Sequence, residues 1–363
     1  MKRGTKIALL AGASLCIVGA ALYGVGSVAG GRAYVGATNL NSLRDTAEYE
    51  SLKEDGYFDQ LTEDEIKLDA FQTLSIDCEN LDVSIVPSDK KYSYLSYEVE
   101  ADKKGNNPLS YEVEDQTLTL KEDNGRSAGS YVHVDISFFG WLIGGESTDY
   151  EEYHKNQVTL HLGEDAEIKN SNIVLGDGDL SVEGMNSKAV TWELGYGDLT
   201  VTDCKLSDGT VTVKDGDILS DNVTSQDVEW VNQYGDWNAK NCALRGGKGE
   251  MSDGDLILDR SSWTDTELTL SYGDLEGKHI ALGNVEVIMK DGDVELDSLT
   301  LSGENAITSQ YGDVDIKLTS ECSEQIVRKE LGSDAREIYS LILALDDGTM
   351  LNAECRDGEI VLK

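Results

Sequence analysis

The chain has 363 residues and a formal net charge of -39, from 69 acidic and 30 basic side chains. Hydrophobic residues make up 39% of the chain, and its 37 glycines raise the apolar share to the level of globular proteins, so the chain can form a hydrophobic core. The excess of acid argues against nucleic acid and anionic lipid headgroups as partners, since both are bound mainly through lysine and arginine.

The amino terminus has the pattern of a membrane anchor. Three basic residues among the first six precede an uncharged segment, Ile7 to Gly31, that is long enough to cross a bilayer as a helix. By the positive-inside rule, residues 1–6 are predicted to be a cytoplasmic tail, residues 7–31 a transmembrane anchor, and the remainder extracellular.

A cleaved signal peptide is the alternative, with Ser27-Val28-Ala29 as its cleavage site. The anchor is favoured because the apolar run is longer than the core of a signal peptide. Residues 32–70 contain many acids and few apolar positions, and we expect them to form a solvated stalk with at most a brief helix.

Residues 71–168 contain short alternating runs that predict strands: Phe71–Asp77, Leu81–Val86, Leu118–Leu120 and Val158–Leu162. They are less regular than the sequence that follows, and we expect them to form the first, irregular turns of the same domain.

An apolar stretch interrupts this segment and includes Phe138, Phe139 and Trp141. It predicts a loop that covers the end of the domain. An exposed contact with the membrane or with a partner is the alternative.

Gly-Asp pairs then recur with a spacing of 19 residues six times and of 20 once. The positions five residues before and two after the glycine are mostly apolar, whereas those four before and three after are mostly polar. Each repeat therefore predicts two short strands that flank a turn, each with one face buried. The glycines predicted to form these structural turns are Gly178, Gly197, Gly216, Gly235, Gly254, Gly273, Gly292 and Gly312.

The position five residues after the glycine decides between a parallel stack and an antiparallel meander, which Asp-Gly turns would also allow. Its last six members alternate in sign: Asp221, Lys240, Asp259, Lys278, Asp297 and Lys317. In a parallel stack with a spacing of about 4.8 Å, every neighbour in this row has the opposite charge. The sequence therefore predicts an all-β parallel β-solenoid, of the right-handed β-helix type, with one rung of about 19 residues per repeat over residues 169–318.

The period is lost after this, and residues 319–363 predict a C-terminal cap with a short helix near Glu324–Leu331 and a hairpin around Asp347-Gly348. Solenoids need such ends because unpaired strands aggregate. Cys322 and Cys355 lie in this cap and are candidates for a disulfide. Cys204 and Cys242 occupy equivalent positions two rungs apart, about 9.6 Å, which is beyond disulfide reach, so they are predicted to be small core residues.

The segment Phe71–Pro87, followed by Val158–Glu167 and then by Gly-Asp-(Leu/Ile/Val) turns, resembles the bacterial adhesin-like β-strand repeat proteins. This is a family of unknown function related to the head domains of autotransporter adhesins. The resemblance covers about residues 71–318. It implies a β-solenoid on a bacterial cell-surface protein, sometimes associated with envelope-stress signalling, and it supplies no catalytic residues.

Two rows of acidic residues run along the turns, one directly after the glycines and one directly before them. An aspartate follows every turn glycine, and adjacent carboxylates in this row would repel each other by on the order of 1 kcal/mol. We expect each to accept hydrogen bonds from the backbone of its own turn. Aspartate precedes the glycine in every second repeat only, which spaces those acids by about a Debye length and relieves repulsion. Tyrosines separate them, in the order Asp177, Tyr196, Asp215, Tyr234, Asp253, Tyr272, Asp291 and Tyr311.

Calcium is the alternative explanation of the acids, because it binds to clustered oxygen ligands. The glycine-rich nonapeptides of calcium β-rolls are absent, so structural turns are favoured and no metal or cofactor is expected. The Tyr/Asp row is a further candidate, as a ligand face for sugars or for a cationic partner. The weak calcium candidates are Asp177, Asp179, Asp215, Asp217, Asp253, Asp255, Asp291 and Asp293.

Catalysis has little support, because there is no Gly-x-Ser-x-Gly motif and the four histidines lack a metal-binding spacing. The sequence predicts a non-catalytic binding, adhesin-like or scaffold module, anchored in the bacterial envelope, with an envelope polymer or a membrane protein as partner. The alternatives are an accessory sensor of an envelope-stress response and, second, a polysaccharide-active β-helix enzyme. The histidines are His133, His154, His161 and His279.

Overall fold

The computed structural model describes residues 60–101, 106–123, 156–333 and 339–363. Nearly all of these belong to one compact unit, Gln60–Val99, Asn107–Asn124 and His154–Lys363. The predicted tail, anchor and apolar cluster of Phe138, Phe139 and Trp141 lie outside the described residues. Within the described ranges, no helix combines the length and the apolar character needed to cross a membrane.

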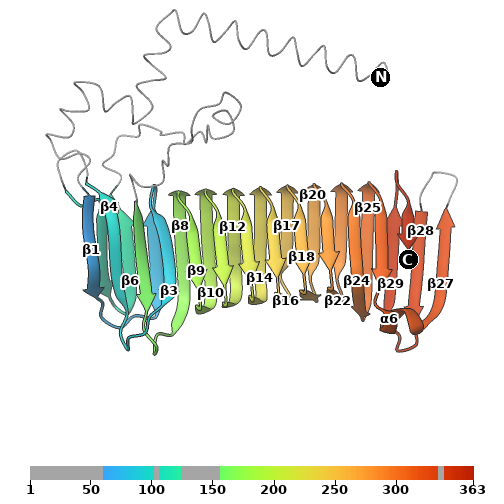
Figure 1. Cartoon of the computed structure of the whole chain (residues 1–363), viewed down its shortest axis with the longest axis horizontal. Helices are drawn as coiled ribbons and strands as arrows, with labels where there is room; N and C mark the ends of the chain where they lie inside the picture. Colours follow the sequence, from blue (N-terminus) through green and yellow to red (C-terminus); the bar gives the residue numbers. More distant parts are fainter. Residues whose placement is uncertain (1–59, 102–105, 124–155, 334–338) are drawn as a thin grey trace, which may run out of the picture. The chain divides into compact units, whose positions relative to one another are not determined.

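The repeats form a parallel β-solenoid of about eight turns, with about 19 residues per turn, as the sequence predicted. In Figure 1 the strands of successive rungs lie side by side from β8 to β25. A mostly short strand follows each Gly-Asp pair: β9 Leu180–Glu183, β11 Leu199–Thr202, β13 Ile218–Asp221, β15 Trp237–Lys240, β18 Leu256–Asp259, β21 Leu275–Lys278, β24 Val294–Ser302 and β26 Val314–Leu318.

Each rung has a second, longer side, which lies between the short strand and the next Gly-Asp pair. In the first four rungs it is one strand, in the next three it is split in two, and in the last it consists of the end of β24, which pairs with β22, and of β25. The strands are β8 Ile168–Asp177, β10 Asn186–Tyr196, β12 Lys205–Asp215, β14 Thr224–Tyr234, β16 Ala243–Arg245 with β17 Lys248–Asp253, β19 Ser262–Thr264 with β20 Glu267–Tyr272, β22 Ala281–Gly283 with β23 Glu286–Asp291, and β25 Glu304–Tyr311.

The register follows the sequence period. Trp192 lies opposite Ile173 on one side and Val211 on the other. The alternating charged row is also in register, from Asp221 to Lys317. At its end, Lys317 Nζ lies 3.1 Å from Asp297 Oδ1. Hydrogen bonds from Ser298 and Lys317 lower the pKa of Asp297.

Each rung also bends at two corners that the sequence did not reveal. Non-glycine residues adopt positive φ there, and most are Asn or Asp, which tolerate the left-handed conformation. The first corner follows the short strand, at Asp203, Asn222, Asn241, Arg260, His279 and Ser298. The second lies within the longer side, at Asp208, Asp227, Gly246, Asp265, Asn284 and Gly303.

The inward side chains of both strand sets form one core, which includes four fully buried tryptophans. Trp237 stacks on Trp230 with ring centroids 5.2 Å apart and lies 5.5 Å from Trp263. This cluster explains the glycine at an otherwise apolar position, because a Cβ on Gly249 would lie 3.2 Å from the Trp263 ring and 2.9 Å from Leu268.

The first rungs are not stacked in sequence order. Strands β2 (Thr73–Cys78) and β3 (Asp82–Pro87) pair directly with β8 and β9. Strands β6 (Thr117–Glu122) and β7 (Gln157–Leu162) pair in parallel with β2 and β3 on their other side. The rung beside the regular repeats, β2 with β3, therefore comes earlier in the sequence than β6 with β7, which form the next rung outward.

Antiparallel strands complete this end. β5 (Leu109–Glu114) pairs with β6, β4 (Tyr94–Glu100) pairs with β7, and β1 (Gln60–Lys67) pairs with β4. Strand β1 lies within the segment expected to be a stalk. The described part of the chain therefore has a strand, β1, where a solvated stalk was expected.

The C-terminal segment adds another parallel rung, in which β29 (Met350–Cys355) pairs with β25 and β30 (Ile360–Leu362) pairs with β26. β28 (Tyr339–Leu345) is antiparallel to β29, which confirms the hairpin around Asp347-Gly348. The helix predicted near Glu324–Leu331 is wrong: α6 spans Ser320–Glu324, and β27 (Ile326–Ser333) follows it and pairs with β28. The sequence could not show that β28 would offer a partner for this segment.

The five cysteines in the described segments are buried free thiols. Cys322 and Cys355 are both unpaired, so the candidate disulfide does not form. Cys204 and Cys242 lie in the core, as predicted, and burial raises the pKa of Cys204 to about 11. Burial raises the pKa of Cys242 as well.

Candidate functional site

The Gly-Asp turns form one edge of the solenoid, and their backbone leaves no room for a side chain. From Gly197 to Gly312 the seven turn glycines have φ between 120° and 156°. A Cβ on each would come within 2.0–2.4 Å of the carbonyl oxygen of the preceding turn's glycine. Glycine is therefore required both for its conformation and for the close approach of successive rungs.

The aspartates that follow the glycines, together with Asp82, form a hydrogen-bonded series, which we call the aspartate ladder. Oδ1 of each accepts the backbone N–H of the next ladder residue at 2.7–3.0 Å. The last N–H is that of Glu359, 2.9 Å from Asp313 Oδ1. The ladder consists of Asp82, Asp179, Asp198, Asp217, Asp236, Asp255, Asp274, Asp293 and Asp313.

The ladder corrects the expectation that each carboxylate accepts hydrogen bonds from its own turn. The acceptor bridges two rungs, so each carboxylate contributes to stacking and offsets the repulsion of its neighbours. The residues at the two ends of these hydrogen bonds lie outside the regular period: Asp82 precedes Asp179 by 97 residues, and Glu359 lies 46 residues after Asp313. Each of these two turns keeps one residue of the Gly-Asp pair and the apolar residue that follows: Leu81-Asp82-Val83 keeps the aspartate, and Gly358-Glu359-Ile360 keeps the glycine.

The residues before the glycines form a second row, which we call the Tyr/Asp stripe: Asp177, Tyr196, Asp215, Tyr234, Asp253, Tyr272, Asp291 and Tyr311. In the strand register Tyr196 lies between Asp177 and Asp215. The four tyrosines are 45–63% exposed. All eight stripe residues are exposed, and in the described part of the chain no hydrogen bond or ion pair engages their side chains.

The calcium candidates divide between these two rows. Asp179, Asp217, Asp255 and Asp293 belong to the ladder, where Oδ1 already accepts a hydrogen bond. Asp177, Asp215, Asp253 and Asp291 belong to the stripe, where tyrosines separate them. Among the described residues, no three Asp, Glu, His or Cys side chains are grouped to hold one metal ion.

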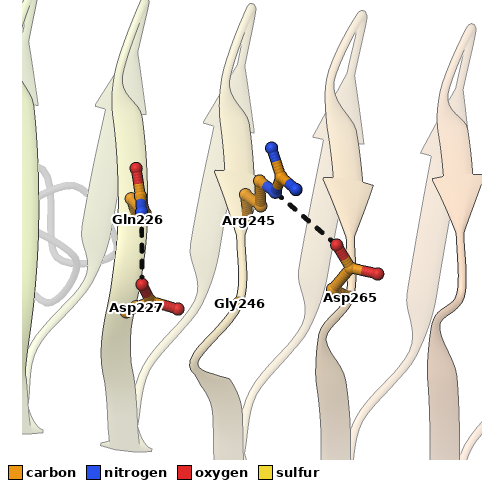
Figure 2. A pocket seen from close by; sticks show the side chains of 5 residues that line it. All are labelled: Gln226, Asp227, Arg245, Gly246 and Asp265. Atoms are coloured by element: carbon orange, nitrogen blue, oxygen red, sulfur yellow. Dashed lines mark hydrogen bonds and ion pairs between the residues drawn. The ribbon is translucent and has the colours of Figure 1, made fainter.

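An open pocket of about 370 Å³ lies at the second corner of the rungs, where Gly246 and Gly247 interrupt the longer side. Figure 2 shows Arg245 directed at Asp265, with its Nε 3.5 Å from Oδ2. Gln226 Nε2 donates to Asp227 Oδ2 at 3.3 Å. The lining contains no histidine, serine or cysteine. Its two carboxylates, Asp227 and Asp265, are each engaged, one by the Gln226 amide and the other by the Arg245 guanidinium.

Two of the four histidines lie in described segments. Ser96 Oγ and His161 Nε2 are 3.0 Å apart, and the Tyr94 ring stacks on the imidazole with centroids 4.1 Å apart. Burial and the charge of Lys90 lower the pKa of His161. No described carboxylate forms a hydrogen bond with this ring, so the arrangement lacks the third member of a triad. His279 forms a corner of the solenoid.

These features define a class of protein: a parallel β-solenoid with glycine turns, a ladder of stacked carboxylates and an exposed aromatic stripe. The chain belongs to the Toastrack DUF4097 family, whose sequence model matches residues 71–262 and 218–333. The family assignment agrees with the predicted resemblance to adhesin-like β-strand repeat proteins of unknown function. Among curated proteins, none matches the chain.

Three solved structures match the chain at low sequence identity. One is a candidate lipid-binding protein from Parabacteroides distasonis, with 13% identity and a TM-score of 0.37, covering 85% of this chain and 96% of that one. A candidate adhesin from Bacteroides fragilis has 12% identity and a TM-score of 0.27, covering 70% and 95%. A candidate cell adhesion protein from Clostridium sporogenes has 10% identity and a TM-score of 0.18, covering 68% and 99%. Similarity at this level carries no argument about the function of this chain.

Proposed function

We propose that the chain is a non-catalytic binding module of the bacterial envelope and that the Tyr/Asp stripe is its ligand face. The observation that carries the proposal is the register of the stripe, in which exposed tyrosines alternate with aspartates along one edge. Stacking repeats this unit every second rung, about 9.6 Å. A ligand that matches such a surface is extended and repeats its own chemistry at a similar interval.

The charge of the stripe favours positively charged ligand groups. Its aspartates lie beside the ladder, whose carboxylates add further negative potential to the same edge. Tyrosine rings attract cations through their π faces, and this attraction adds to that of the carboxylates. We therefore propose a ligand that presents amino or guanidinium groups along an extended chain, such as a basic segment of an envelope protein.

The binding proposal predicts that a lysine heptamer binds to the full chain and that binding requires the stripe. Replacing the four stripe tyrosines with serine should weaken binding at least about tenfold, because each ring contributes a cation–π contact. Titration calorimetry at two salt concentrations measures the effect.

Two controls separate the stripe from general electrostatic attraction. Serine at the exposed Leu219 and Ile257, which lie on the short strands, should leave affinity unchanged. Changing the four stripe aspartates to asparagine should weaken binding more than changing Glu250, Glu276, Glu286 and Glu295 to glutamine, although both remove four charges. Equal losses in the two sets would contradict a specific ligand face.

The proposal places the module outside the cell, attached through residues 7–31. The basic residues before this uncharged segment support that orientation. Protease added to intact cells that produce the full chain should then digest the solenoid while a cytoplasmic marker survives. Protection of the solenoid from the protease contradicts the orientation, and release of a chain that begins after Ala29 contradicts the anchor.

A further inference from the structure

Strand β27 ends its sheet with one open edge. It pairs with β28 on one side, and no other described strand pairs with it. Seven of its eight residues are exposed, among them Val327 at 67% and Leu331 at 55%. An open edge with exposed apolar side chains is a surface on which another strand can pair.

The neighbouring strand shows how incompletely this edge is covered. Leu341 and Leu343 of β28 are fully buried. Their cross-strand partners on β27 are Leu331 and Lys329, which are exposed. The hydrophobic face of the sheet therefore extends from the core to β28 and remains uncovered at β27.

We propose that a second copy of this chain pairs with β27 through its own β27, antiparallel and about a two-fold axis at Lys329. Side chains that lie opposite each other in an antiparallel pair share a face, so the axis must pass through a residue. With Lys329 at the axis, Arg328 faces Glu330 of the second copy, and Val327 faces Leu331 of the second copy. Each of these pairs occurs twice because the interface is isologous.

Charge complementarity selects this register and this occupant. Within one chain, Arg328 Nε and Nη2 donate to the two carboxylate oxygens of Glu330, both at 2.9 Å. The pair lowers the pKa of Glu330 and raises that of Arg328, so both remain charged near neutral pH. In the dimer each guanidinium lies between two carboxylates. A partner strand of another sequence would not supply this reciprocal pattern.

Two features oppose pairing and make the dimer weak. The pairing of β27 with β28 is irregular between Ile326 and Arg328, and Lys329 faces its own copy across the axis. One pair of strands also buries less surface than a standard stable interface. We expect dissociation constants on the order of 100 µM.

The test uses full chains in detergent, labelled with two fluorophores, with energy transfer and sedimentation as readouts. Arg328→Glu and Glu330→Arg should each weaken self-association at least about tenfold, because like charges then face each other. Mixing these two variants should restore association, since every facing pair is again opposite. Lys329→Thr should tighten the dimer.

Lys214→Glu and Glu193→Lys serve as matched controls, because this exposed ion pair lies far along the solenoid from β27. Both should associate like the unchanged chain. Circular dichroism confirms that the exposed substitutions leave the fold intact. A monomeric unchanged chain, or single β27 variants that associate like it, would overturn the proposal, and so would failure of the mixture to associate.

Discussion

Replacing Gly254 with alanine should lower the free energy of unfolding by about 3 kcal/mol or more. The residue has φ of 129°, and a Cβ would lie 2.1 Å from the carbonyl oxygen of Gly235. Neither the unfavourable φ nor the clash can relax locally, because the Cβ would meet backbone that is fixed by rungs on both sides. Chemical denaturation, followed by circular dichroism, measures the loss.

Gly332→Ala is the matched control, because Gly332 lies in an exposed strand and only Ser340 Oγ, at 3.1 Å, approaches its Cβ position. Alanine there should be neutral or slightly stabilising, since it reduces the entropy of the unfolded chain. If both substitutions had the same small effect, the rungs would not be held as closely at the turns as the structure shows.

The position of Gly254 adds a second expectation. In a solenoid each rung contacts only its neighbours, so stability is a sum of rungs and of the interfaces between them. Gly254 lies in the middle of the array, where loosening one interface divides the stack. Unfolding of the alanine variant should therefore be less cooperative than that of the unchanged chain, with a smaller dependence on denaturant.

The parallel stack was predictable because two independent sequence features agreed. The glycines fixed the period, and the alternation from Asp221 to Lys317 made sense only if equivalent residues were neighbours. The structure has that register. The regular rungs could be predicted because each repeats the same pattern of residues.

The ends of the solenoid were not predictable in the same way. The turn at Leu81-Asp82 is separated from the next rung by a long insertion, and the turn at Gly358 by the antiparallel strands of the cap. A period search fails across such insertions, although each turn keeps an acidic residue, Asp82 or Glu359, followed by an apolar one. By composition, residues 326–331 fit a helix as well as a strand. They form a strand because they pair with β28.

The aspartate ladder shows the limit of reasoning from one turn at a time. Hydrogen bonding of an aspartate to its own turn is common, and the spacing of the repeats cannot distinguish it from bonding to the next rung. The structure settles this, since Asp236 Oδ1 accepts the N–H of Asp255 at 2.9 Å, nineteen residues along the chain. The carboxylates are therefore part of the stacking interaction.

Changing Asp236 and Asp255 together to asparagine or to alanine separates the hydrogen bonds from the charge. Both double variants remove the same two charges, but asparagine keeps an oxygen that can accept the N–H of the next rung. The alanine variant should be less stable than the asparagine variant by about 2 kcal/mol, since each neutral hydrogen bond contributes about 1 kcal/mol. Urea unfolding of both variants gives the difference.

The asparagine variant should equal or exceed the unchanged chain in stability, because it removes repulsion between carboxylates stacked about 4.8 Å apart. Added salt should reduce that advantage by screening the repulsion. Alanine at Asp215 and Asp253 is the control, since these stripe residues carry the same charge without ladder hydrogen bonds and should tolerate the change. A ladder whose alanine and asparagine variants unfolded at the same urea concentration would be only a row of solvated acids. A difference of the predicted size would instead show that each carboxylate accepts a hydrogen bond from the next rung and holds the next turn in register.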